Sequence, residues 1–142
     1  MSEVGPATPE ITAIIKSGDE TWALSFEGDL MLTIEWADYA ERIFISASAG
    51  KPPAARKAEV CSTLLAYNLL RSQTGGVTAA AFGPDSETTL ICDLHVPTLQ
   101  LSELRTVLVN FADLTQRWAD YVTGDGGQAA PKDGIALMLN LA

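Results

Sequence analysis

The sequence predicts an α+β domain, in which helices pack against a five-stranded, mainly antiparallel sheet. Three observations carry this prediction. Short runs of alternating apolar residues, typical of half-buried strands, occur in a group of three and later in a group of two. A leucine-rich helical pattern lies between the two groups, and a longer amphipathic pattern follows them. With a short helical pattern before the first strand, the predicted order is α-β-β-β-α-β-β-α.

The chain begins with a polar stretch and a short apolar segment. Residues 1–10, MSEVGPATPE, contain two prolines and little apolar surface, so we expect a flexible N-terminal arm. In PEITAIIK, residues 9–16, Ile11, Ile14 and Ile15 stand at helical spacing, and this stretch is the first helix of the predicted order. Because the stretch is short, a strand is nearly as well supported.

Three strands are expected next, over residues 21–26, 30–36 and 42–48. The first two alternate large apolar side chains with smaller or polar ones, and the third is rich in β-branched and aromatic residues. Short turns connect them, which indicates an antiparallel meander. One face of the first two strands carries the largest apolar side chains of this region: Trp22, Leu24, Phe26, Leu32, Ile34 and Trp36.

A helix and a hairpin follow. The prolines at 52–53 suit a helix start, and one of the glycines at 75–76 supplies the left-handed residue expected to end the helix. Strands are predicted at residues 77–82 and 88–94, with the turn GPDSE between them.

The last helix has the clearest pattern in the chain. We expect it from Glu103 to Val122, with Ser102 as its N-cap. Its apolar residues recur at spacings of three and four along one side: Leu104, Val107, Leu108, Phe111, Leu114, Trp118, Tyr121 and Val122. Residues 11–123 are thus expected to form a single domain, and residues 124–142 a linker with an apolar C-terminal tail.

Composition restricts the partners. The net charge is −9 and the isoelectric point about 4.4, and the nine basic residues are scattered, so neither nucleic acid nor an anionic membrane surface is an expected partner. No apolar run approaches the length of a transmembrane helix, so we expect no stable membrane insertion. The N-terminus lacks the pattern of a signal peptide, and two cysteines do not form a disulfide framework, so a cytoplasmic protein with reduced thiols is expected.

No residue pattern indicates catalysis, a metal or a cofactor. His95 is the only histidine, and the Cys92/His95 spacing has no second ligand pair for zinc. The Thr74-Gly75-Gly76 run follows a helix, whereas a phosphate-binding loop precedes one. We therefore predict no catalytic residue, no metal ligand and no cofactor.

The apolar residues allow two interpretations. Those of the first two strands are either ordinary core or, at the edge of the sheet, part of a surface that receives an extended peptide by β-addition. Val60, Leu64 and Tyr67 of the second helix belong either to the core or to a dimer interface.

From "LLAYNLL" in the second helix to "RWADYV" in the last one, the chain resembles the class I type III secretion chaperones of the Tir chaperone (CesT-like) family. The resemblance covers roughly residues 20–122 and consists of packing residues: Leu64, Leu65, Asn68, Leu69, Gly75, Gly76, Leu101, Leu104, Leu108, Phe111 and Trp118. Two departures are the short first helix and the apolar C-terminus.

The resemblance implies a homodimeric, cytoplasmic chaperone of a Gram-negative bacterium, without ATP hydrolysis. It would hold the N-terminal segment of a secreted effector in extended form and keep it soluble and secretion-competent. The residues expected to bind the effector are the six of the first two strands, Trp22 to Trp36. The expected dimer interface comprises Val60, Leu64, Tyr67, Val77, Ala79 and Ala81.

Two alternatives remain open at this point. One is a small α+β enzyme with an apolar pocket that uses His95 or a buried carboxylate. The other is a regulatory dimer that sequesters a folded protein instead of an extended segment.

Overall fold

The computed structural model describes residues 1–37, 39 and 41–134. The apolar terminal run predicted at residues 135–142 lies outside the described residues. The helices and strands are α1 (Val4–Ala7), β1 (Ile11–Gly18), β2 (Thr21–Phe26), β3 (Met31–Ala37), β4 (Arg42–Gly50), α2 (Lys57–Leu69), β5 (Thr78–Phe82), β6 (Glu87–His95) and α3 (Leu101–Thr123).

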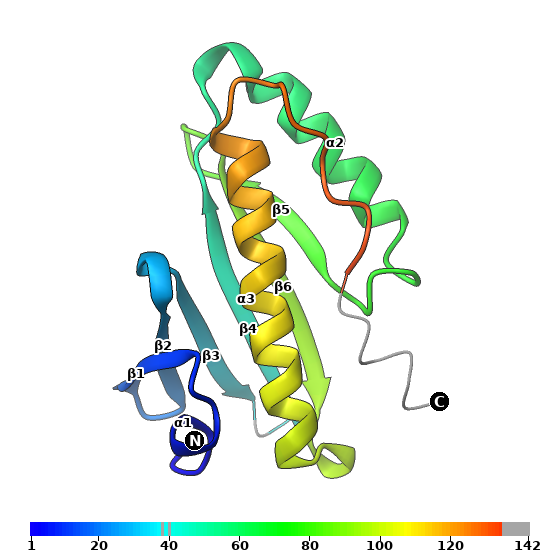
Figure 1. The fold of residues 1–142 in the computed structure, drawn as a ribbon. Coiled ribbons are helices and arrows are strands. Elements are labelled where there is room, and N and C mark those ends of the chain that lie inside the picture. Colours follow the sequence, from blue (N-terminus) through cyan, green and yellow to red (C-terminus); the bar gives the residue numbers. More distant parts are fainter. Residues whose placement is uncertain (38, 40, 135–142) are drawn as a thin grey trace.

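The strands form one antiparallel sheet with the order β1-β2-β3-β4-β6-β5. β6 pairs with β4, so the α2 connection carries the chain past β6 to the edge position of β5 (Figure 1). The predicted α+β class is confirmed, with six strands in place of the expected five.

The additional strand is β1, and the helix predicted over residues 9–16 is wrong. Ile11, Thr12, Ile14 and Ile15 are β-branched, and a tight turn at Ser17–Glu20 brings β1 against β2. An isolated helix of this length does not repay its nucleation, whereas a strand gains a complete ladder of hydrogen bonds with its neighbour.

The first ten residues, expected to be a flexible arm, contain the one-turn helix α1. Val4 is 1% exposed and belongs to the hydrophobic core. The hydroxyl of Thr8, a residue that is itself buried, accepts a hydrogen bond from the Arg105 Nε of α3 at 3.1 Å. The N-terminal segment is therefore held on the domain by Val4 in the core and by the hydrogen bond from α3 to Thr8.

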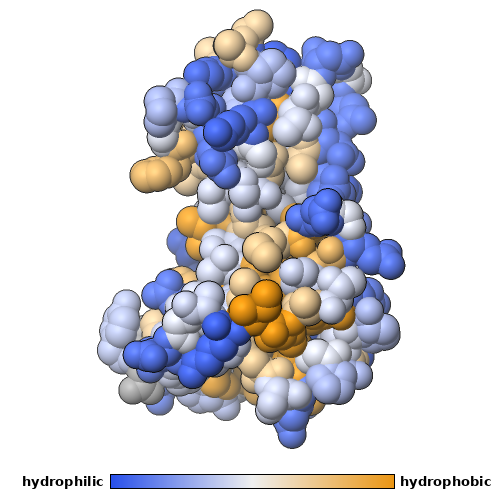
Figure 2. All heavy atoms as spheres, turned by 90° about the vertical axis from the view of Figure 1, so that its left-hand side faces the viewer, coloured by the Kyte–Doolittle hydropathy of each residue, from blue (hydrophilic) through white to orange (hydrophobic). Residues whose placement is uncertain are grey.

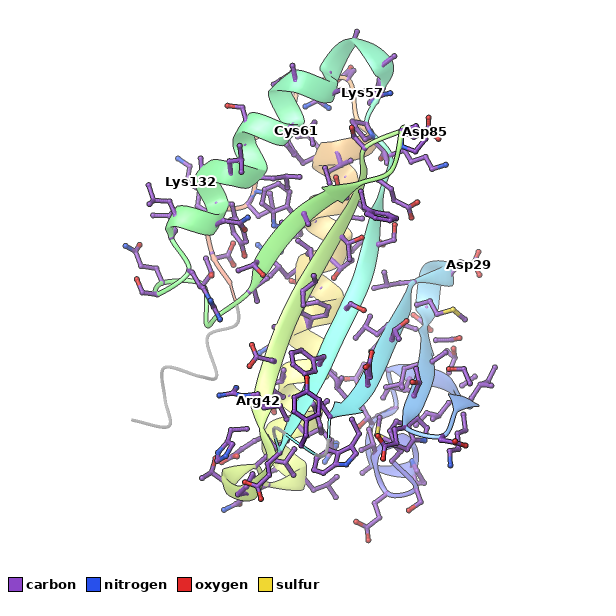
Figure 3. The ribbon with its side chains drawn as sticks, turned by 180° about the vertical axis from the view of Figure 1, so that it is seen from behind. Asp29, Arg42, Lys57, Cys61, Asp85 and Lys132 are labelled. Carbon is purple, nitrogen blue, oxygen red and sulfur yellow. The ribbon has the colours of Figure 1, made fainter. Side chains whose placement is uncertain are left out.

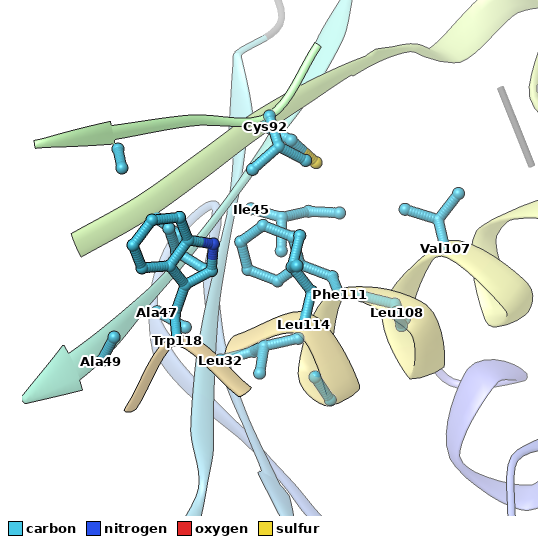
Figure 4. Close-up of a cluster of buried hydrophobic side chains, with 14 of the residues drawn as sticks. Leu32, Ile45, Ala47, Ala49, Cys92, Val107, Leu108, Phe111, Leu114 and Trp118 are labelled. Atoms are coloured by element: carbon cyan, nitrogen blue, oxygen red, sulfur yellow. The ribbon is translucent and has the colours of Figure 1, made fainter. Parts of the chain in front are cut away.

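α3 lies along one face of the sheet and forms the core with it (Figures 1 and 4). Phe111, Leu114 and Trp118 of α3 are completely buried against the apolar side chains of the central strands. The helix begins at Leu101, two residues before the prediction. Gln100, not Ser102, is the N-cap, because it forms a capping box with Glu103, whose carboxylate accepts the Gln100 N–H at 3.0 Å.

α2 begins at Lys57, after a short 3₁₀ turn at Ala54–Arg56, and ends at Leu69. The glycines predicted to end it lie several residues later, and both have positive φ, 67° for Gly75 and 86° for Gly76. They close the turn that leads into β5, where Gly76 N donates to the Arg71 carbonyl at 3.2 Å.

No helix of the described chain covers the opposite face of the sheet (Figure 3). Several large apolar residues of this face are exposed to solvent, among them Ile15, Met31, Phe82 and Ile91. No helix in the described part of the chain combines the length and the apolar character needed to cross a bilayer.

Candidate partner-binding surfaces

Most of the residues predicted to bind an effector lie in the core. Leu24 and Leu32 are 0% exposed and face each other across β2 and β3, and Phe26 and Ile34 are also buried. The two tryptophans, Trp22 and Trp36, are half-buried and are the members of the set with solvent contact. The structure thus places four of the six where only a rearrangement would expose them to a partner.

The residues predicted for a dimer interface are also mostly internal. Five of the six are buried on the side of α2 and β5 that faces the core: Val60, Leu64, Tyr67, Val77 and Ala79. Ala81 is exposed. The apolar residues that these elements show to solvent are others, namely Leu65 at 72%, Leu69 at 86% and Phe82 at 80% exposure.

β1 forms one edge of the sheet, and its backbone groups alternate between its neighbour and solvent. On β2, Phe26 donates its N–H to the Leu30 carbonyl at 2.8 Å, so the even-numbered residues of β2 bond toward β3. The alternation of an antiparallel ladder then turns Ala23 and Ser25 toward β1.

The outward groups of β1 follow from this register. Ala13 and Ile15 lie opposite Ser25 and Ala23 and bond to β2. The N–H and C=O groups of Ile14 and Lys16 therefore point away from the sheet, and within the described residues no protein group hydrogen-bonds them. This edge is open to a further strand.

Two hollows lie at this end of the sheet, one along β1 and one near its start. One, of about 480 Å³, lies between α1 and β1 and is lined by Trp22, Ile11 and Ile14 among others. The other, of about 430 Å³, lies between β2 and α3, and its lining includes three apolar and three acidic side chains: Phe26, Leu30, Val109, Glu10, Glu27 and Asp113. Figure 2 shows hydrophobic side chains gathered on the side of the molecule that carries β1, with hydrophilic residues around them.

At the other end of the molecule a buried arginine joins α2 to the end of α3. Arg56 is 7% exposed and donates hydrogen bonds of 2.8 Å to the carbonyls of Tyr121 and Gly124. Its guanidinium also lies 4.9 Å from the centre of the Tyr121 ring. The Arg56 guanidinium supplies hydrogen-bond donors for the free carbonyls at the C-terminus of α3. Its positive charge is also stabilised by the negative end of the α3 helix dipole.

Aromatic contacts continue this junction. The Trp118 ring packs edge-on against Tyr67 of α2, with centroids 4.9 Å apart, and against Tyr121, with centroids 5.7 Å apart. Burial raises the pKa of Tyr67 to about 12, so the phenol remains protonated and donates to the Asp133 carbonyl at 2.9 Å.

The segment after α3 runs back beside α2 (Figure 1). Near its end, Arg117 of α3 donates hydrogen bonds of 2.7 and 3.0 Å to the two carboxylate oxygens of Asp133. These hydrogen bonds hold the pKa of Asp133 below its ordinary value. The part of the predicted linker up to residue 134 is thus attached to the domain.

The residues considered for catalysis are not brought together. His95 lies at the end of β6, about half-exposed, with Glu41 at 4.0 Å, and burial raises the pKa of the Cys92 thiol to about 12. Over residues 1–37, 39 and 41–134, no group of three or more His, Cys, Asp or Glu side chains is arranged to hold a metal ion.

Comparison with known protein families identifies one family for this chain. The model of the Tir chaperone protein (CesT) family matches residues 13–119, which include most of β1, all of β2 to β6 and most of α3. The chain belongs to this family. The prediction of a type III secretion chaperone that binds effectors is therefore confirmed. Among curated protein sequences none matches significantly.

Two solved structures have a similar fold. One is the crystal structure of the ExsC-ExsE complex, with a TM-score of 0.66, 14% identity, and coverage of 78% of this chain and 83% of that one. The other is the HopA1-SchA chaperone-effector complex, with a TM-score of 0.66, 13% identity, and coverage of 83% and 88%. At these identities the likeness concerns the fold.

Three residues of these surfaces were not singled out as site residues from the sequence. Arg56 and Asp133 carry no recognisable pattern, because their partners are a distant helix end and a distant arginine. Asn68 had one signal, its place near the end of the leucine-rich helix in the family resemblance. Its hydrogen-bond partner, the Ala79 backbone, is known only from the structure.

Proposed function

We propose that this chaperone binds an extended, apolar and basic segment of a secreted effector along the open edge of β1. The observation that carries the proposal is the pair of unbonded backbone positions at Ile14 and Lys16. An extended segment that adds there gains main-chain hydrogen bonds. Both solved structures of similar fold are complexes, one of them of a chaperone with its effector, and they support this type of partner.

The surroundings of the edge supply affinity and charge selection. Alternate side chains of an added strand point to the two faces of the sheet, and the hollow beside Trp22 receives those on the inner face. Glu10, Glu27 and Asp113 line the neighbouring groove, so basic residues of the effector are attracted to it. Of the six residues predicted for this role, Trp22 and Trp36 keep solvent contact, and Trp22 lines the hollow beside β1, which supports a role for Trp22 in effector binding.

The chaperone acts as a cytoplasmic homodimer and not as an enzyme. The exposed Leu65 and Leu69 of α2 and Phe82 of β5 form the apolar surface suited to the partner subunit, with the buried residues Val60, Leu64 and Tyr67 supporting it from within. Binding alone keeps the effector segment from aggregating, because its apolar side chains are covered until secretion.

Lys16→Pro tests the proposal, since proline removes the outward N–H of β1 and leaves its bonds to β2 in place. The probe is the N-terminal segment of a secreted protein encoded beside the gene, co-expressed with the chaperone. We expect the wild-type dimer to retain one segment, and Lys16→Pro to reduce the affinity by a factor of about 10 or more, the loss of one or two main-chain hydrogen bonds.

The matched control is Ala81→Pro, which removes an outward N–H at the opposite edge and should leave the affinity unchanged. Equal affinities of the wild type and Lys16→Pro, with both proteins folded, would refute binding at β1. A chain that binds no such segment in any form would refute the chaperone proposal itself.

A further inference from the structure

The second edge of the sheet, formed by β5, differs from the first in its hydrogen bonds. The side-chain amide of Asn68 in α2 donates from Nδ2 to the Ala79 carbonyl at 2.7 Å, and its Oδ1 accepts the Ala79 N–H at 2.7 Å. Only one orientation of the carboxamide satisfies both bonds. These are the two bonds that a residue of a neighbouring antiparallel strand would exchange with Ala79.

The preceding outward position is closed as well. The Val77 N–H donates to the Thr74 carbonyl at 3.4 Å, and the Thr74 hydroxyl donates to the Val77 carbonyl at 3.0 Å. Thr74 is itself completely buried. The next outward position, Ala81, has no hydrogen-bond partner within the described residues.

The sequence of this strand explains why such closure matters. β5 reads TAAAF and is followed by a turn, so it has no charge, no proline and no β-bulge to discourage pairing. Within β5, Ala80 and Phe82 are exposed to solvent. A small, uncharged edge strand of this kind is a template for pairing with another chain.

We propose that Asn68 is a specificity-determining residue that stands in for a missing strand and closes the β5 edge against strand addition. With Thr74 it leaves Ala81 as the one outward position of this edge without a partner among the described residues, and one position is too few for a ladder of hydrogen bonds. A second copy of the chain can then dock on this end through side chains alone, and an extended effector segment is directed to the β1 edge. The closure does not depend on the effector proposal, because it concerns the chain by itself.

The experiment compares the full chain with Asn68→Leu, which preserves the size of the side chain and removes both hydrogen bonds. Amide hydrogen exchange is measured by NMR, and particle mass by light scattering over a range of concentrations, without any effector. In the wild type the Ala79 amide is expected to exchange at least about five-fold more slowly than the Ala81 amide. In Asn68→Leu this difference disappears, and the mass rises with concentration above that of the wild type.

Two further variants fix the interpretation. Gln73→Ala, an exposed change in the neighbouring turn, should behave as the wild type. Adding Ala81→Pro to Asn68→Leu should restore the wild-type mass, because proline blocks the last outward N–H of the edge.

An Ala79 amide that exchanges as fast as Ala81 in the wild type would overturn the proposal. So would an unchanged mass of folded Asn68→Leu, or a raised mass that Ala81→Pro does not reverse. Should Asn68→Leu not fold, Asn68→Asp decides: it keeps the acceptor for the Ala79 N–H but donates nothing to the carbonyl. It should then associate more than the wild type, and a wild-type mass would refute the role of Asn68.

Discussion

The two ends of the sheet are built differently. At the β5 end, α2, the C-terminal part of α3 and the segment up to residue 134 are joined by Arg56, Tyr67 and Trp118. At the β1 end, a one-turn helix covers part of the face on which α3 packs, and the N–H and C=O groups of Ile14 and Lys16 have no hydrogen-bond partner among the described residues. The first end is closed and firmly packed, and the second is open and thinly covered.

The difference teaches how a small sheet protein directs its partners. Both ends expose apolar side chains, so hydrophobicity alone does not distinguish them. The distinction lies in the backbone, because strand addition needs a row of free N–H and C=O groups. In our proposals, a side-chain amide closes the β5 edge and the β1 edge receives the extended partner.

The largest effect is expected from removing the aromatic contacts of Trp118 with Tyr67 and Tyr121 at the β5 end. Trp118→Ala deletes a completely buried indole and should lower the free energy of unfolding by about 3–5 kcal/mol. Trp36→Ala, a change of the same size at a half-buried position of β3, should cost clearly less. Urea unfolding followed by circular dichroism measures both, and equal losses would show that the β5 end is not the more firmly packed one.

A smaller effect is expected at the thinly covered end. Val4→Ala removes two buried methyl groups from α1 and should cost about 1–2 kcal/mol. Because α1 packs against β1, amide exchange should accelerate in β1 and β2 while β6 and α3 remain protected. Acceleration spread evenly over the whole sheet would mean that the two ends unfold as one unit.

The smallest effect concerns the ion pair that attaches the C-terminal segment. Asp133→Asn should cost under about 1 kcal/mol, because the pair is substantially exposed. The folded-state pKa of Asp133 lies below its ordinary 3.8, so this contribution is present above pH 3.8 and disappears as the pH falls through the folded-state pKa. The difference in unfolding free energy between wild type and Asp133→Asn, measured by urea unfolding at several pH values, should therefore vanish in acid, and a difference that persists below the folded-state pKa would contradict this role of the ion pair.

The sequence predicted the parts of the fold that depend on periodicity. The stripe of α3, the alternation of β2 and β3 and the β5–β6 turn all follow from residue spacing, and the structure confirms them. The prediction from sequence was wrong where the secondary structure depends on tertiary contacts. Ile11, Ile14 and Ile15 suit one face of a helix and a strand equally well, and these residues form a strand because they pair with β2. The N-cap of α3 is Gln100, because its side chain accepts the Glu103 backbone N–H and the Glu103 carboxylate accepts the Gln100 backbone N–H.

The candidate surfaces show the same division. Sequence pattern identified apolar residues without separating core from surface, so Leu24, Leu32 and Leu64 were expected to face partners and are buried. Periodicity records which side chains are apolar, and burial depends on which element covers them.

The sequence by itself determined the fold class and the acidic character of this chain, because these depend on local spacing and composition, and it indicated the family through shared packing residues. Only the tertiary structure decided which sheet edge is open. Asn68 and Ala79 are 11 residues apart, and Arg56 and Tyr121 are 65 apart. No local sequence pattern predicts that the Asn68 side chain will hydrogen-bond the Ala79 backbone, because this contact forms only when α2 is packed beside the sheet.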